Sequence, residues 1–174
     1  NLKVHGYIAY PTDQSKKYPC IIWNRGGYGN NGVIDQFSAR GMFGLIASWG
    51  YVVFASQYRG NSRSEGKDEV GGGDVNDILN IISLADEFDF ADQSKWGIEG
   101  WSRGGMMTYL TLLKNQNFKC AVLVGAISDL KNYIETSANR ISIYKTFIGE
   151  KDFEKKLEER TIINFVEKLP NIPY

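Results

Sequence analysis

A serine between glycines is the residue whose type and spacing point most clearly to chemistry. Gly100, Ser102 and Gly104 form the pattern G-x-S-x-G. A short apolar run ending at Ile98 precedes the pattern, and the run 106–113 after it is typical of a helix. A sharp strand-to-helix turn holds a serine hydroxyl clear of the backbone at the carboxyl end of a strand. The pattern therefore favours a nucleophilic serine over a chance match in a chain with 19 glycines.

Two backbone regions are candidates to stabilise the oxyanion that such a serine would produce from an acyl group. The N–H of the residue after the nucleophile, Arg103, points to where the oxyanion forms. The glycine pair Gly26 and Gly27 follows a short apolar run at 19–24 and lets the backbone approach a ligand closely. Given the serine downstream, we predict an oxyanion loop at this pair rather than an ordinary glycine turn.

A partner base for the serine is harder to find. His5 is the only histidine and lies near the N-terminus, in a segment that alternates between polar and apolar residues. We expect it on the face of a strand, and a role as base for Ser102, supplied from a neighbouring chain, is the weaker alternative. Asp129 lies just past a predicted strand and is an alternative acid for a catalytic triad.

Hydrophobic periodicity predicts the elements that position these residues. Strands are expected at 2–10, 19–24, 51–56, in the run that ends at Ile98, and at 118–125. Helices are expected at 33–49, 74–88 and 106–113, with two or three short ones within 131–169. The runs 19–24 and 118–125 are apolar throughout, as in strands buried on both faces. This alternation predicts an α/β fold, a three-layer α/β/α sandwich with a mostly parallel sheet and helices on both faces.

Several charged residues have an ordinary interpretation beside a functional one. The polar loop after the third predicted strand carries Arg59, Arg63 and Glu65, which could contact a substrate or simply be solvated. Asp74 and Asp77 fall in the first turn of a predicted helix, where negative charge suits the helix dipole. We therefore expect these two aspartates to cap the helix rather than to take part in catalysis.

Composition sets the broad limits. The chain has 174 residues, enough for one domain with a sizeable core, and its formal net charge of zero does not favour nucleic acid or a membrane surface as a partner. No apolar run reaches the ~18 residues of a membrane helix, and no metal or dinucleotide motif predicts a cofactor. Cys20 and Cys120 both fall in predicted buried strands, so we expect free buried thiols.

Three motifs in the order of the chain resemble the α/β-hydrolase superfamily, and within it the prolyl-oligopeptidase-like group of dipeptidyl and acylaminoacyl peptidases and related esterases. Arg25-Gly26-Gly27 is similar to that group's His-Gly-Gly oxyanion loop, with arginine in place of histidine. Residues 58–62 are similar to its Tyr-Arg-Gly-Ser loop, and residues 100–105 to its nucleophile elbow. The resemblance implies acyl transfer, with Ser102 as nucleophile and the amides of Gly27 and Arg103 as the oxyanion hole.

The resemblance also implies what residues 1–174 lack. In this fold the triad runs Ser, then Asp or Glu, then His, and the strand carrying the acid would begin at about Ile172. We therefore expect a partial catalytic domain, incomplete at its C-terminal sheet edge, with the acid and histidine outside it and little activity alone. Such an edge could pair with a second copy.

The expected substrate is a peptide or another small molecule. The sequence does not separate a peptidase from a carboxylesterase of the same fold, and a non-catalytic binding module is the third alternative.

Overall fold

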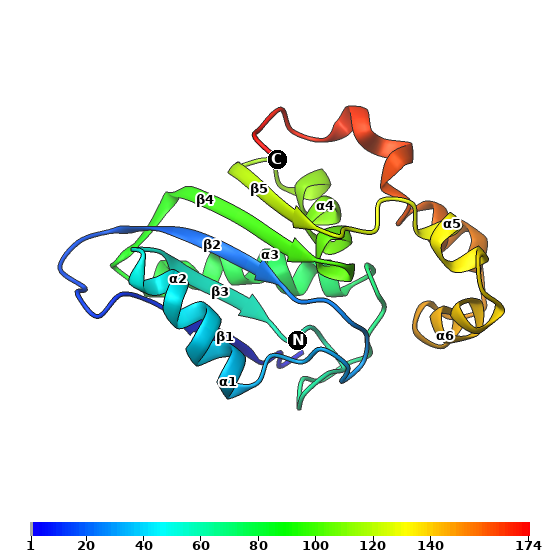
Figure 1. Cartoon of the computed structure of the whole chain (residues 1–174), viewed down its shortest axis with the longest axis horizontal. Helices are drawn as coiled ribbons and strands as arrows, with labels where there is room; N and C mark the ends of the chain where they lie inside the picture. Colours follow the sequence, from blue (N-terminus) through cyan, green and yellow to red (C-terminus); the bar gives the residue numbers. More distant parts are fainter. Residues whose placement is uncertain (1) are drawn as a thin grey trace.

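A central β-sheet organises the computed structural model, which describes residues 2–174 (Figure 1). Its strands are β1 (Gly6–Ala9), β2 (Tyr18–Asn24), β3 (Val52–Ser56), β4 (Ala91–Trp101) and β5 (Phe118–Val124). They lie in the order β1-β3-β2-β4-β5. β1 pairs antiparallel with β3, and the other neighbours are parallel. The predicted, mostly parallel sheet is confirmed.

Helices cover the sheet and the carboxyl ends of its strands. They are α1 (Gln36–Ser38), the π-helical turn η1 (Ala39–Phe43), α2 (Gly44–Ser48), α3 (Asp74–Leu84), the 3₁₀ turn η2 (Ala85–Glu87), α4 (Arg103–Lys114), α5 (Leu130–Glu135), α6 (Ala138–Ile148), α7 (Phe153–Glu158) and the 3₁₀ segment η3 (Ile162–Lys168). α1 and α2 lie on one face, α3 and α4 lie on the other, and α5 and α6 lie beyond the carboxyl ends (Figure 1). The three-layer architecture is therefore as predicted. Among residues 2–174, no helix has the length and apolar character to cross a bilayer.

The helices that follow β2 and β4 lie on opposite faces of the sheet. β2 leads into α1 and α2 on one face and returns as β3, whereas β4 leads into α4 on the other face and returns as β5 (Figure 1). Adjacent strands with diverging connections leave a crevice at their carboxyl ends, where ligands of open α/β sheets bind. The glycine pair that follows β2 and the serine that follows β4 both lie at this point.

β2 is buried on both faces, as its apolar sequence predicts. Successive side chains of a strand point to opposite faces. Cys20 and Ile22 belong to the larger core cluster, which includes residues of α4, while Trp23 belongs to the smaller cluster with Phe43 of η1 and Ile46 of α2. The strand that precedes the glycine pair is therefore held by packing on two sides.

The prediction that 118–125 is buried on both faces is wrong. Phe118 and Ala121 of β5 pack in the core, but Cys120 is exposed and Val122 is 52% exposed. β5 is the last strand of the sheet, and the layer of α1, η1 and α2 packs over β1 and β3 at the other side. An open groove of about 370 Å³ remains over β4 and β5 on that face.

Two element boundaries also differ from the prediction. The segment 90–94, expected as a loop, belongs largely to β4, because Ala91 pairs with Tyr18 of β2 before a register shift. The helix expected over 33–49 is divided into α1, η1 and α2, with Gly41 in the π-helical turn η1 and Gly44 at the start of α2. Glycine favours such interruptions because it lowers helix stability.

The last residues lie along the outer edge of β5. The backbone N–H of Ala121 donates to the carbonyl of Pro173 at 2.9 Å. The sequence predicts the start of another strand at 169–174, and this hydrogen bond puts that segment beside β5, although no regular strand forms there.

The thiols provide a test of the layer arrangement. Cys20 is completely buried, and burial raises the pKa of its thiol to about 12, with the charge of Asp92 acting in the same direction. We predict that a disulfide reagent modifies Cys120 in the native protein at pH 8, whereas Cys20 reacts only after unfolding. Thiol counts with and without denaturant check this, with Cys120→Ser as the control. Two rapidly reacting native thiols would contradict the burial of β2.

Candidate active site

Ser102 lies at a strained turn between β4 and α4. Its backbone has φ 53° and ψ −117°, a conformation that residues with a side chain rarely adopt. The serine is exposed, as a nucleophile must be. Its N–H donates to Val124 of β5 at 2.8 Å, and its carbonyl accepts from Gly105 at 3.0 Å as α4 begins. Strand, sharp turn and helix therefore occur as the G-x-S-x-G pattern predicts.

Glycines make the turn possible because backbone groups occupy the space of a side chain. A Cβ at Gly100 would collide with the carbonyl of Gly104, and one at Gly104 would collide with the carbonyl of Asn24 at the end of β2. A Cβ at Gly26 would lie 3.0 Å from the carbonyl oxygen of Trp101 and 3.6 Å from the Ser102 Cβ. The glycine loop after β2 and the serine turn after β4 are thus in direct contact.

The backbone amides of Gly27 and Arg103 are not used by the hydrogen bonds of the fold. Arg103 is the first residue of α4, where N–H groups have no partner within the helix. Within residues 2–174, neither amide donates a hydrogen bond to another group of the chain. Gly27 has φ 73°, and a Cβ there would collide with the carbonyl of Asn31. The structure therefore leaves two free donors on the two segments that meet at Ser102.

The side chain of Arg103 is buried, which the sequence does not predict. Only 2% of it is exposed, and its guanidinium donates to Asp68 Oδ1 at 2.6 Å and to Asp68 Oδ2 at 2.9 Å. It also pairs with Asp74 and donates to the carbonyl of Gly27 at 3.0 Å. One side chain thus ties the serine turn to the glycine loop and to two aspartates.

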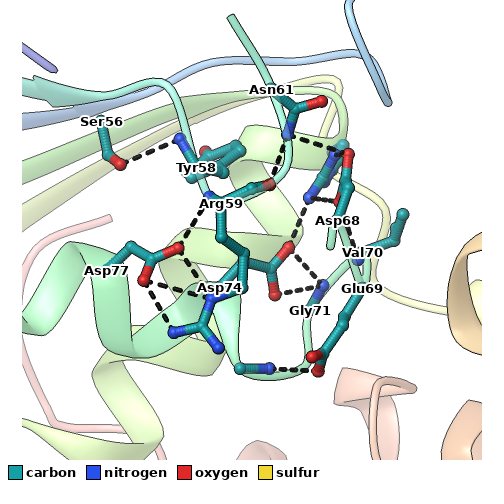
Figure 2. Close-up of polar contacts among 12 residues, drawn as sticks. Ser56, Tyr58, Arg59, Asn61, Asp68, Glu69, Val70, Gly71, Asp74 and Asp77 are labelled. Carbon is teal, nitrogen blue, oxygen red and sulfur yellow. Dashed lines mark hydrogen bonds and ion pairs between the residues drawn. The ribbon is translucent and has the colours of Figure 1, made fainter. Parts of the chain in front are cut away.

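The two carboxylates respond differently to this environment. Burial acts to raise the pKa of Asp68, but the hydrogen bonds and charge of Arg103 outweigh it, so the pKa lies below its ordinary value. Asp74 is completely buried, and this burial raises its pKa despite the charge of Arg103. Asp68 also accepts from Gly29 at 2.8 Å and from the Asn61 side chain at 3.2 Å, a contact visible in Figure 2. Of these two carboxyl groups, Asp68 is therefore the one whose surroundings favour the charged form.

A second guanidinium, that of Arg25, also contacts the glycine loop. Arg25 is completely buried, and the guanidinium carbons of Arg25 and Arg103 lie over the Tyr58 ring, 5.0 and 4.9 Å from its centroid. Burial lowers the pKa of Arg25, and the nearby charge of Arg103 acts in the same direction. The hydroxyl of Tyr58 donates to the carbonyl of Arg25 at 3.2 Å. Arg25, at the position where the resemblance implies histidine, is therefore a buried structural residue that supports the glycine loop.

The interpretation of Asp74 and Asp77 as helix caps is wrong. Both lie in the first turn of α3, but the cap residue is Gly73 and makes no side-chain cap bond. Asp74 pairs with Arg103 and accepts from the N–H of Gly71. Asp77 forms a close ion pair of 2.7 Å with Arg59 (Figure 2). Arginines from other segments compete for these carboxylates more strongly than the helix amides do.

The other charged residues of that loop have different surroundings. Glu65 accepts from the N–H of Lys3 at 2.9 Å, and Arg63 is exposed. Arg59 is held by Asp77 rather than directed at Ser102.

His5 and Asp129 are not brought together with the serine. His5 precedes β1, and its carbonyl accepts from Gln57 just past the end of β3. β3 and β2 lie between β1 and β4, so three strand spacings of about 4.8 Å separate His5 from the serine turn. Asp129 caps α5 by accepting from Asn132 at 3.0 Å. Among residues 2–174, no histidine lies beside Ser102.

The sequence analysis did not predict that four polar residues next to the site are buried and support it. They are Arg25, Tyr58, Asn61 and Asp68. The signal for Arg25 and Tyr58 was their position at the carboxyl ends of two predicted strands. Asp68 gave no signal, because a single acidic residue in a polar loop is usually solvated.

Comparisons with known proteins identify the family of this chain. The sequence profile of the prolyl oligopeptidase family matches residues 36–171. The uncharacterized peptidase YtmA of Bacillus subtilis is 29% identical over 171 residues, which are 97% of this chain and 65% of YtmA. Dipeptidyl peptidase 8 of Mus musculus is 30% identical over 144 residues, or 76% of this chain and 16% of that protein. The chain thus spans less than two thirds of the length of these relatives.

Solved structures give the same fold. The acylaminoacyl peptidase of Pyrococcus horikoshii superposes with a TM-score of 0.78 and 26% identity, over 95% of this chain and 28% of that protein. A puromycin-hydrolyzing peptidase of Mycobacterium tuberculosis superposes with a TM-score of 0.80 over 96% of this chain and 28% of its own, with 22% identity. At 22% identity, the likeness to the Mycobacterium tuberculosis structure shows a shared fold alone. Both are α/β-hydrolase peptidases, as the motifs imply.

The Asp68 ion pair makes a prediction about acid stability. Because its pKa is lowered in the folded state, Asp68 stabilises the protein above the ordinary aspartate pKa, and this contribution is lost as pH falls through the lowered value. We expect Asp68→Asn to lower the free energy of unfolding by about 3 kcal/mol at pH 7, since one partner of a buried pair is removed. The deficit should shrink as pH falls below about 4.

Urea unfolding monitored by tryptophan fluorescence at several pH values measures this difference. Asp86→Asn, at an exposed position, is the control and should change little. A deficit for Asp68→Asn that is the same at pH 7 and pH 3 would contradict a charged Asp68 in the folded protein.

Proposed function

The chain belongs to the prolyl oligopeptidase family, and on that premise we propose that Ser102 is the nucleophile of a serine peptidase. The observation that carries the proposal is the exposed hydroxyl of Ser102 on a strained turn, beside the free amides of Gly27 and Arg103. A strained residue persists only where surrounding structure holds it, and such residues cluster at functional sites.

The proposed reaction is acyl transfer in two steps. Ser102 Oγ attacks the carbonyl carbon of the substrate while a histidine takes its proton, and the amides of Gly27 and Arg103 donate to the oxyanion. Collapse of the tetrahedral intermediate expels the leaving group, which takes the proton from the histidine. Water then releases the acyl group from the serine by the same steps. Loss of one oxyanion donor typically costs about 100- to 1,000-fold in rate.

We propose that the histidine and its acid partner come from outside residues 1–174. The separation of His5 from Ser102 by two intervening strands supports this. So does the role of Asp129 as the cap of α5, which occupies its carboxylate. Residues 1–174 then form a partial catalytic domain that contributes the nucleophile and the oxyanion hole.

A peptide is the proposed substrate. The relatives at 26–30% identity are named as peptidases, which supports a peptide over an ester. A carboxylesterase of the same fold would use the same serine and amides, and a non-catalytic binding module would not use them.

A fluorophosphonate probe tests the nucleophile. We predict that the natural protein, with any residues beyond 1–174, is labelled on Ser102 and that Ser102→Ala abolishes the label. Residues 1–174 alone should react slower by a factor on the order of a million, the cost of losing the histidine in a comparable enzyme. Mass spectrometry of the labelled peptide identifies the site.

The outcomes separate the alternatives. An unlabelled natural protein would overturn the hydrolase proposal and favour the binding module. If the protein is labelled, hydrolysis of dipeptide amides compared with short-chain p-nitrophenyl esters distinguishes a peptidase from a carboxylesterase. Hydrolysis of the esters alone would overturn the peptidase proposal.

We also propose that residues 1–174 self-associate through β5 and its open face. Trp101 at the end of β4 and Val122 and Val124 of β5 are 49%, 52% and 39% exposed. The segment 169–174 contacts the edge of β5 at Ala121 without forming a strand, and an apolar edge that lacks a paired strand promotes association. Sedimentation velocity of residues 1–174 should reveal dimers that Val122→Lys weakens. A monomer at every concentration tested would contradict this proposal.

A further inference from the structure

The buried guanidinium of Arg25 donates hydrogen bonds to the carbonyl oxygens of the glycine loop. Its Nη1 donates to the carbonyl of Gly26 at 3.0 Å and to that of Asn31 at 3.1 Å, and its Nη2 donates to that of Gly29 at 3.0 Å. Its Nε donates to the carbonyl of Gln57 at 3.1 Å, which anchors the side chain to the end of β3. Every donor nitrogen of this buried side chain therefore contacts backbone carbonyls.

Arg103 continues the same pattern at the next peptide group. Its Nη1 donates to the carbonyl of Gly27 at 3.0 Å, while Asp68 accepts the N–H of Gly29 at 2.8 Å. The carbonyls of Gly26 and Gly27 are thus both directed toward buried guanidinium groups. If the peptide group of Gly26 or that of Gly27 rotated, a buried guanidinium would lose a hydrogen-bond acceptor.

The direction of a carbonyl determines the direction of the following amide. In a trans peptide the C=O and the N–H of the next residue point to opposite sides, and residues 2–174 contain no cis peptide. A Gly26 carbonyl directed at Arg25 therefore makes the Gly27 N–H point away from Arg25. Ser102 lies next to this peptide group, since a Cβ at Gly26 would be 3.6 Å from the Ser102 Cβ.

A guanidinium suits this role because it has five donors in a rigid plane and no acceptor. It can satisfy several carbonyls at once, and it cannot stabilise a flipped peptide that presents an N–H to it. The Tyr58 ring stacks 5.0 Å from the Arg25 guanidinium and limits its movement. A lysine ammonium in its place would reach fewer carbonyls and would lack the planar stacking.

We propose that Arg25 is a positioning residue, which holds the Gly26 carbonyl inward so that the Gly27 N–H faces the oxyanion formed at Ser102. The inference rests on the proposed function of Ser102 and assigns to Arg25 the orientation of one of its two oxyanion donors.

The test compares Arg25→Met and Arg25→Lys with the wild type in the natural protein, with any residues beyond 1–174. The first readout is the second-order rate of Ser102 phosphonylation by a fluorophosphonate, whose phosphoryl oxygen occupies the oxyanion position. We expect Arg25→Met to lower this rate by about 100- to 1,000-fold, the usual effect of losing one oxyanion donor. Arg25→Lys, which keeps the charge, should lower it nearly as much.

A matched control separates orientation from general destabilisation. Arg160 is also a buried arginine, and it donates to the carbonyls of Val70 and Lys156 at 2.9 and 2.7 Å, away from the glycine loop. Arg160→Met should lower the unfolding temperature as Arg25→Met does and leave the phosphonylation rate near that of the wild type.

The second readout is the ³¹P chemical shift of the phosphonylated serine, which senses hydrogen bonds to the phosphoryl oxygen. We expect the adduct of Arg25→Lys to shift toward the value of the unfolded adduct, and the adduct of Arg160→Met to keep the wild-type value. This comparison remains decisive if Arg25→Met does not fold.

The failures are distinguishable. A wild-type protein that is not phosphonylated overturns the proposed function, and the inference with it. A wild type that reacts, with Arg25 variants that match it in rate and ³¹P shift, overturns the inference and leaves the proposed function intact. Equal rate losses in the Arg25 and Arg160 variants would also overturn it.

Discussion

The burial of two guanidinium groups behind the serine turn is the constraint on which the site depends. Arg25 is completely buried and Arg103 is 2% exposed. A buried charge without partners costs several kcal/mol, so each group must find acceptors in a fixed arrangement. Those acceptors come from the glycine loop, from the end of β3 and from the aspartates Asp68 and Asp74. Satisfying two arginines therefore orders three separate loops around one serine.

The same cluster helps to hold a strained backbone. Ser102 has a positive φ, which costs of the order of 1–3 kcal/mol in a residue with a side chain. Its neighbour Arg103 has its side chain fixed by ion pairs and its backbone in the first turn of α4. On the other side, Gly104 packs its Cα against the carbonyl of Asn24. Relaxation of the serine would have to break the ion pairs or separate β2 from α4.

Local patterns predicted the parts of this structure that depend on neighbouring residues. The nucleophile turn has its signature in five residues, and the doubly buried β2 has its signature in six. Burial of β5 was not predictable in this way, because an apolar strand looks the same in the middle of a sheet and at its edge. Cys120 is exposed for that reason, although its sequence context matches that of Cys20.

The ion-pair cluster was not predictable because its members are distant in sequence. Asp68 and Arg103 are 35 residues apart, and neither stands in a pattern that indicates a buried charge. Asp74 does stand in such a pattern, the first turn of a helix, and the general rule for that position gave the wrong role. Tertiary partners overrode a local preference that is worth less than about 1 kcal/mol at an exposed site.

The charges of the cluster indicate how it acts on the reaction. Arg25 and Arg103 carry two positive charges, and the carboxyl groups of Asp68 and Asp74 both lie against Arg103. Within this cluster both guanidinium groups donate to carbonyls of the glycine loop. Its influence is therefore directional: the guanidinium groups hold carbonyls, the carbonyls orient amides, and the amides contact the developing charge. A site of this design depends on the shape and donor number of its arginines more than on their charge.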